Sequence, residues 1–197
     1  MKTMKHLLLS IAICIGIASV AGAQVLTPNG NRSDQINLKM HEVDMLIQIM
    51  PLLLTKDQFP KILTAIEKNR EILRKELQYE DDELAKLEPL LDDAMKGAYE
   101  KGAYPPRKMS DTVADKTAKL SLQRRIIVAM MIHNMSDVLD TTLNVGQKKA
   151  IIGSFDPKFI DPSAKPDSMS DDRKTSFFIE RVFLDPITYE ILKKLDK

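Results

Sequence analysis

The sequence predicts an all-α protein: a hairpin of about four long helices, followed by a C-terminal extension that ends in a helix. Leu, Ile, Lys, Glu and Met are abundant, tryptophan is absent, and there are only 7 glycines in 197 residues, a composition typical of long helices. Apolar residues recur every third or fourth position over segments of up to about forty residues. No segment shows the alternation of apolar and polar residues that is expected of a β-strand.

The first 23 residues have the pattern of a secretory signal peptide. Lys2 and Lys5 precede an apolar run from Leu7 to Ala18, and the small residues around Ala23 form a cleavage site before Gln24. The run is too short for a membrane span, although an uncleaved anchor is the alternative. We therefore expect cleavage near Ala23–Gln24 and a periplasmic or secreted protein without stable membrane insertion.

The mature chain divides into three predicted parts: a flexible leader over residues 24–33, a helical domain over 34–155, and an extension over 156–197 made of a polar connector and a terminal helix. With 29 basic and 28 acidic residues, the chain is nearly neutral. This balance argues against a nucleic-acid partner. The only cysteine, Cys14, lies in the signal peptide, so disulfides and thiolate chemistry are excluded from the mature protein.

Local signals place the boundaries of the helices. We expect a first helix over 34–53, weakened by Pro51, and a second from 55 to about 100. Pro89 should kink or interrupt this second helix, and the glycines of residues 97–102 with the two prolines that follow should end it. A third helix should start near Ser110 or Asp111 and reach about 140. A short fourth helix should open at Asn144, and a last helix should have Asp185 as its N-cap and Pro186 as its first residue.

One motif occurs twice. In Leu54-Thr55-Lys56-Asp57-Gln58, the Thr55 hydroxyl can accept from the Gln58 amide while the Gln58 side chain reaches back to the Thr55 amide. This capping box stabilises a helix by about 1 kcal/mol. Leu143-Asn144-Val145-Gly146-Gln147 repeats the arrangement, with Asn144 as the cap and Gln147 three residues later.

Two Leu-(Thr/Asn)-x-x-Gln boxes, each after an apolar helix in an exported helical chain, resemble the LTxxQ-motif family of periplasmic proteins (Spy/CpxP-like envelope-stress proteins). The resemblance covers about residues 34–154. It implies an ATP-independent, chaperone-like protein of the stress response that binds unfolded envelope proteins and assembles as a dimer. Mobile apolar side chains would line the client surface, and the candidates are Leu46, Ile49, Met50, Met131 and Met135.

The charges of the second helix are uneven. Of the charged residues in 61–75, five are basic and two acidic, whereas of those in 80–93, seven are acidic and one is basic. One interpretation is a solvated helix with local ion pairs. The other is an antiparallel homodimer through residues 55–100, in which each basic half lies on the partner's acidic half.

Histidine and methionine suggest a second function, a periplasmic metal-binding sensor or buffer. Thioether and imidazole ligands suit Cu, and imidazole with carboxylate suits Ni, Co or Zn. Metal-responsive members of the resembled family bind metals through such residues, although methionine is also common in cores. The candidates lie on the first and third predicted helices: His41, Met45, Met130, His133 and Asp137.

Enzyme chemistry finds no support in the sequence. There is no HExxH, no Gly-rich phosphate loop, no GxSxG and no catalytic cysteine. We therefore expect a chaperone-like protein and no enzyme; a metal-binding protein and a structural envelope component are the alternatives.

Overall fold

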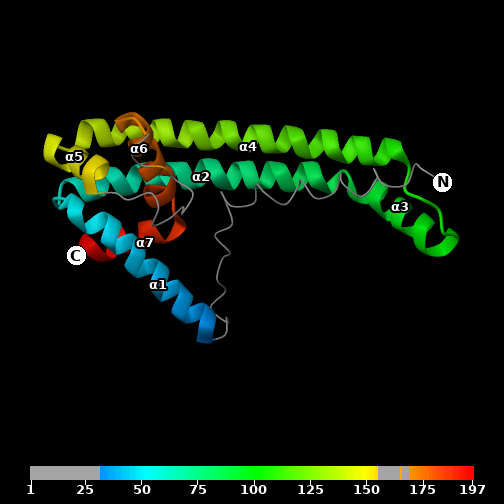
Figure 1. Cartoon of the computed structure of the whole chain (residues 1–197), viewed down its shortest axis with the longest axis horizontal. Coiled ribbons are helices and arrows are strands. Elements are labelled where there is room, and N and C mark those ends of the chain that lie inside the picture. The colour runs from blue at the N-terminus through cyan, green and yellow to red at the C-terminus, as the bar shows by residue number, and fades with distance from the viewer. Residues whose placement is uncertain (1–31, 155–164, 166–168) are drawn as a thin grey trace. The chain divides into compact units, whose positions relative to one another are not determined.

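A computed structural model of the chain describes residues 32–154, 165 and 169–197 (Figure 1). The all-α prediction is confirmed for this part, in which no strand occurs, but the α-helices number seven rather than about four. They are α1 (Arg32–Ile49), α2 (Gln58–Ala85), α3 (Glu88–Lys101), α4 (Arg107–Thr142), α5 (Val145–Ser154), α6 (Asp171–Phe178) and α7 (Pro186–Leu195). A 3-10 helix, η1 (Met50–Leu52), follows α1, and a π-helix, η4 (Ile179–Phe183), follows α6.

The chain divides into two compact units, residues 1–41 and residues 42–197. The description below concerns the second unit unless it states otherwise. The predicted signal peptide, and most of the predicted polar connector, lie outside the described residues. Among the helices that are described, none is long and apolar enough to cross a membrane.

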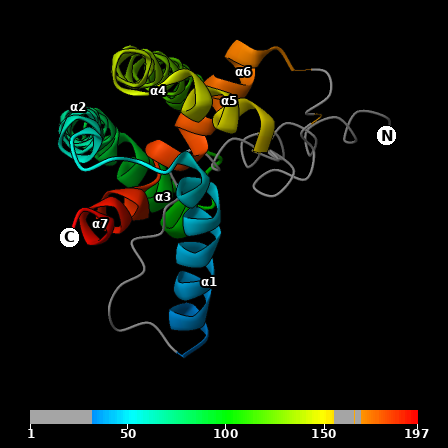
Figure 2. The ribbon, with the colours of Figure 1, turned by 90° about the vertical axis from the view of Figure 1, so that its left-hand side faces the viewer.

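The longest contact in this unit is between α2 and α4, which lie side by side in both views of the ribbon (Figures 1 and 2). The two helices are antiparallel, because residues late in α2 meet residues early in α4. Asn69 bonds to Met131 near one end, whereas Glu83 bonds to Lys116 near the other.

Proline and glycine interrupt the helices as predicted. The second predicted helix breaks into α2 and α3, with Pro89 in the first turn of α3. Gly102 ends α3 in the left-handed conformation (φ 60°), and its N–H bonds to the Ala98 carbonyl at 3.1 Å. Pro51 lies in η1, where α1 has already ended. These positions follow from the φ and hydrogen-bond limits of the two residue types.

Two predicted helix starts are wrong by a few residues. The third predicted helix begins at Arg107 rather than at Ser110 or Asp111, because Pro106 is extended and its carbonyl already accepts from the Met109 amide at 3.0 Å. Helix α2 begins at Gln58 rather than at Thr55, as the next subsection explains. By contrast, Asp185 caps α7 as predicted and accepts from the Ile187 amide at 2.9 Å.

The C-terminal residues complete the hydrophobic core. Helix α7 lies against α2, and η4 lies against α4. The rings of Phe178 and Phe183 meet edge to face with centroids 5.5 Å apart. Ile179, Val182, Ile191 and Leu192 of the same C-terminal segment belong to one cluster with these rings. Buried side chains of earlier parts of the chain complete the cluster, among them Met45, Ile49, Leu52, Phe59, Ile62, Ile66, Met135, Leu139, Leu143 and Ile151.

Candidate functional site

The two LTxxQ-like boxes meet in space. The side-chain amides of Gln58 and Gln147 bond to each other twice, with each Nε2 donating to the other Oε1 at 2.9 and 2.8 Å. Both glutamines are buried. The residues are 89 positions apart in the sequence, so the contact joins the start of α2 to the start of α5.

Each glutamine makes two kinds of further bond, one to a carbonyl just before the other box and one to a backbone amide of its own box. Gln58 Nε2 donates to the Thr142 carbonyl at 2.8 Å, and Gln147 Nε2 donates to the Leu52 carbonyl at 2.9 Å. Each Oε1 also accepts from the backbone N–H three residues earlier. Gln58 Oε1 accepts from Thr55 at 3.0 Å, and Gln147 Oε1 accepts from Asn144 at 2.9 Å. Both buried amides are therefore fully hydrogen-bonded, as buried polar groups need to be. We call this arrangement the glutamine junction.

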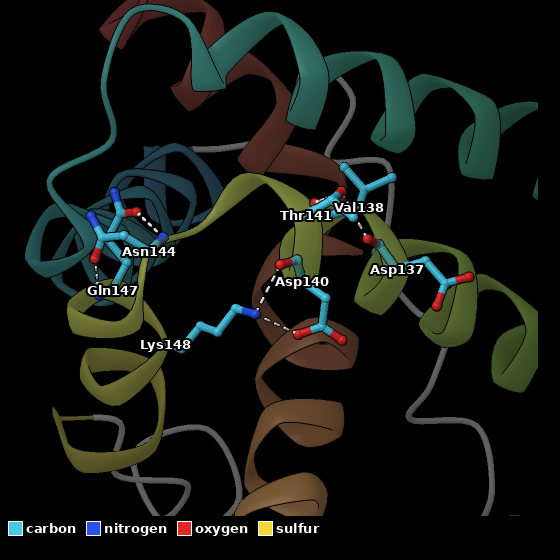
Figure 3. A network of polar contacts seen from close by, with 7 residues as sticks. All are labelled: Asp137, Val138, Asp140, Thr141, Asn144, Gln147 and Lys148. Carbon is cyan, nitrogen blue, oxygen red and sulfur yellow. Dashed lines mark hydrogen bonds and ion pairs between the residues drawn. The ribbon is translucent and has the colours of Figure 1, made fainter.

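The second box is a complete reciprocal capping box (Figure 3). Asn144 Oδ1 accepts from the Gln147 amide at 2.9 Å while the Gln147 side chain accepts from the Asn144 amide at the same distance. Lys148 turns back toward α4 and bonds both to the carbonyl and to the carboxylate of Asp140, each at 2.9 Å. The start of α5 is thus fixed against the end of α4.

The first box forms only half of the predicted arrangement. Gln58 reaches back to the Thr55 amide as expected, but the Thr55 hydroxyl donates to the Asp57 carboxylate at 2.6 Å. The backbone N–H of Gln58 donates instead to the Thr55 carbonyl at 2.9 Å, and this bond closes a turn before α2. The Thr55 carbonyl, and not the Thr55 hydroxyl, thus accepts from the Gln58 N–H, and α2 starts three residues later than predicted. Because the Thr55 hydroxyl donates to it, the Asp57 carboxyl has a pKa below its usual value.

The apolar residues of the boxes pack in the core beside the junction. Leu143 and Phe59 are buried, and Leu54 is partly buried against the same cluster. The boxes therefore join polar capping and core packing at one end of the α2–α4 pair.

Polar side chains continue along the α2–α4 contact. Asn69, which is buried, donates to the Met131 carbonyl at 3.0 Å. Further along, Gln123 donates to Glu76 at 2.9 Å, and Arg124 makes a two-point contact with Glu80 through Nε (2.8 Å) and Nη2. The contact with Glu80 raises the pKa of Arg124 above its already high value.

Glu83 closes this polar series between Lys116 and Lys86. It accepts from Lys116 of α4 and from Lys86 of the α2–α3 turn. Hydrogen bonds from Lys116 and then Lys86 lower the pKa of Glu83 to about 2. Two residues of the acidic half of the predicted dimer face, Glu80 and Glu83, thus make their contacts within the chain, to Arg124 and Lys116 of α4. The dimer through residues 55–100 stays a prediction.

Three of the five candidate client residues lie in the interior. Ile49, Met131 and Met135 are almost completely buried, and Met135 has no exposed surface at all. They pack in the core or against α2 in this structure, and their assignment as client-binding residues stays a prediction. Leu46 is partly buried against the core, and Met50 is exposed. The apolar segment Phe177–Ile179 near the C-terminus also packs inward, because Phe178 and Ile179 are buried.

The face of α4 turned away from α2 carries apolar residues that our sequence interpretation missed. Leu122, Ile126 and Met130 are exposed, with Ile126 at 60%. Polar side chains bound them at each end: Lys119 pairs with Asp115 at 2.8 Å, and the His133 Nε2 lies 3.7 Å from the Asp137 carboxylate. We call these three residues the α4 stripe. The signal was present in the sequence, because Leu120, Met131 and Met135 already account for the buried face of α4.

The candidate metal residues are in different environments. Met45 is buried in the core, whereas Met130 and the pair His133–Asp137 are exposed on α4. His41 belongs to the other unit of the chain. Within the described residues, no group of three or more His, Cys, Asp or Glu side chains is arranged to hold an ion. The metal hypothesis therefore stays a prediction.

Comparisons with known proteins found no matching family model, no matching curated protein and no matching solved structure.

Proposed function

We propose that the protein is an exported, ATP-independent chaperone-like protein that holds apolar segments of unfolded proteins on the α4 stripe. In this proposal the mature chain starts at Gln24, acts in the periplasm or outside the cell, and catalyses no reaction. The α2–α4 pair serves as an open helical support, and the glutamine junction fixes one end of that support.

The α4 stripe is the observation that carries the proposal. Leu122, Ile126 and Met130 occupy two turns of helix, about 12 Å at 1.5 Å per residue, which matches an extended segment of roughly four residues. A patch of this size stays within the few hundred Å² that soluble proteins expose. Binding would be weak and reversible, and the flexible side chain of Met130 would accept apolar groups of different shapes.

Charge around the stripe favours one kind of client. No acidic residue occurs in residues 116–136, and basic residues occur at 116, 119, 124 and 125. Lys116 and Arg124 are neutralised by α2, but Arg125 is exposed on the same side as the stripe. Apolar segments that carry acidic residues would therefore be attracted and would bind faster at low salt.

The test is suppression of aggregation by the mature protein without nucleotide. A chemically unfolded client is diluted into buffer with increasing amounts of the protein, and light scattering is measured. We expect suppression near equimolar ratio, and Ile126→Asp should require several-fold more protein. Ser121→Asp adds the same charge at an exposed position of α4 outside the stripe and should behave as wild type.

Circular dichroism controls for folding, since Ile126 is more than half exposed and its replacement should leave helical content unchanged. The proposal fails if wild type suppresses none of several clients, or if the two aspartate variants lose activity equally.

A further inference from the structure

The far end of the α2–α4 pair carries exposed aromatic residues. Helix α3, the turn after it and the start of α4 lie at this end, opposite α5 and α7 (Figure 1). Tyr99 of α3 is 86% exposed, and Tyr104 of the turn is 94% exposed. A tyrosine ring with this exposure keeps most of its apolar surface in water. The two rings are therefore available to a partner outside the chain.

The other apolar side chains of α3 are also only partly covered. All 14 residues of this helix are exposed or half-buried. Leu91, Met95 and Tyr99 follow one another in steps of four, which place them along one side of the helix, and all three are exposed. Between α3, the turn and the start of α4 there is a hollow of about 180 Å³, lined mainly by apolar side chains. This end of the pair thus has more apolar surface than its own packing covers.

Positive charge surrounds these apolar side chains. Residues 95–109, which we call the α3 tip, contain four basic residues and one acidic residue: Lys96, Lys101, Arg107, Lys108 and Glu100. All five are exposed. The chain as a whole is nearly neutral, so the basic character is a local property of this end.

Acidic side chains begin directly behind the α3 tip. Asp92 and Asp93 precede it on α3, Asp111 and Asp115 follow it on α4, and all four are exposed. Asp92 lies seven residues before Tyr99, which is about 10 Å along a helix and about one Debye length at physiological salt. An anionic surface would therefore attract the tip and repel the part of the pair behind it. Such a surface would meet the α2–α4 pair end-on.

We propose that the α3 tip binds reversibly to the surface of a membrane that contains anionic lipids. Tyr99 and Tyr104 enter the headgroup region, where tyrosine is enriched in membrane proteins because its ring is apolar and its hydroxyl is polar. The basic side chains lie at the level of the anionic headgroups, with their aliphatic stems along the apolar boundary. These basic residues come from both α3 and α4, so a flat anionic surface can meet them together.

Membrane attachment goes beyond the proposed function, because it uses no residue of the α4 stripe. Leu122 and Met130 lie 15 and 23 residues after Arg107, which is about 22 and 35 Å along α4. The headgroup region is only about 5–8 Å thick on each side of a bilayer. A protein bound through the α3 tip would therefore hold the stripe clear of the membrane, where it stays open to the solvent.

Co-sedimentation with lipid vesicles tests the charge requirement. The mature chain is used, because the apolar run of residues 7–18 would bind vesicles by itself. It should bind vesicles of phosphatidylcholine and phosphatidylglycerol at two to one, and not phosphatidylcholine alone, and salt should weaken the binding. Lys101→Glu with Lys108→Glu should weaken it at least tenfold, since each lysine near an anionic surface contributes about fivefold. Lys61→Glu with Lys68→Glu is the matched control, which makes the same change at exposed lysines near the other end of α2 and should bind as wild type does.

Tryptophan fluorescence tests which residues enter the headgroup region. The chain has no tryptophan, so a single introduced indole reports only on its own surroundings. Tyr99→Trp and Tyr104→Trp should each shift their emission to shorter wavelength when the mixed vesicles are added, and brominated lipids should quench them. Tyr79→Trp is the control at an exposed tyrosine of α2 and should show neither effect. Circular dichroism should be the same for all three variants.

Three results would overturn the proposal. They are equal or absent binding to the two kinds of vesicle, equal loss of binding in the two lysine pairs, or an emission shift at position 79 as large as at 99 and 104. A tip that instead served to dock a protein would give the first of these results.

The aggregation assay separates this inference from the proposed function. Lys101→Glu with Lys108→Glu should suppress aggregation as wild type does, and Ile126→Asp should bind vesicles as wild type does. A wild type that binds the mixed vesicles but suppresses no client would refute the proposed function alone. A wild type that suppresses aggregation but binds no vesicles would refute the membrane proposal alone.

Discussion

Truncation of Gln147 to alanine tests the glutamine junction. The substitution removes the acceptor of the Asn144 amide and the donor to the Leu52 carbonyl, both at 2.9 Å, together with the two bonds to Gln58. Each backbone group left without a partner in a buried site costs about 1–3 kcal/mol. Some water entry and relaxation of the site will offset part of this cost. We therefore expect Gln147→Ala to lower the free energy of unfolding by about 2–4 kcal/mol.

The measurement is urea denaturation of the mature protein followed by circular dichroism, with the slope of the transition compared between variants. Gln78→Ala is the matched control, because the Gln78 side chain is exposed and bonds only to Asp82 on the helix surface. Its cost should stay within about 0.5 kcal/mol.

A double-mutant cycle isolates the contact between the glutamines. Gln58→Ala and Gln147→Ala both delete the same two mutual hydrogen bonds. The sum of the single effects should therefore exceed the effect of the double variant by about 1–2 kcal/mol. The reasoning is refuted if Gln147→Ala costs no more than Gln78→Ala, or if the two single effects add exactly as independent sites do.

Three further predictions concern the caps, the ion pairs and the core. Asn144→Ala should cost about 1 kcal/mol in the same denaturation assay and Thr55→Ala clearly less, because only Asn144 caps its helix through the side chain. The pKa of Glu83 is lowered from 4.5 to about 2 in the folded state, so its stabilisation is complete above about pH 4.5 and is lost as the pH falls toward 2. When the free energy of unfolding is measured at decreasing pH, the Glu83→Gln variant should not show this loss. Phe183→Ala should lower stability by about 3–5 kcal/mol, since Phe183 is completely buried, and equal melting temperatures for variant and wild type would contradict the packing.

The parts of the fold that the sequence predicted depend on neighbours in the chain. Pro89 and Gly102 end helices through their own backbone limits, and Asp185 caps α7 through an amide two residues away. The predicted start at Thr55 failed for an equally local reason, since the Thr55 carbonyl accepts from the Gln58 N–H in place of the Thr55 hydroxyl. Such competition between two nearby acceptors is not visible from the motif alone.

Contacts between distant residues could not be predicted in the same way. Spacing identified the buried face of α4, but not that Gln58 would meet Gln147. Spacing also gave no sign that Phe178 and Phe183 would complete the core of the earlier helices. For the candidate site, an apolar residue on a helix is equally consistent with a core or an open surface. Only the packing separates Met131 and Met135 from Ile126.

The glutamine junction and the core lie at one end of the α2–α4 pair, which we call its base. The length of the two helices beyond this base can change without altering the packing there. Gln58 and Gln147 hold the two ends of the intervening chain together, while α3 and the turn around Gly102 lie at the far end. Two helical turns could be removed from α2 and from the facing part of α4 without changing any bond of the junction. The α4 stripe would then move nearer to the far end or be lost, while the core around Phe183 stayed as it is. The length of the α2–α4 pair beyond the junction and the stability of its base can therefore change separately in evolution.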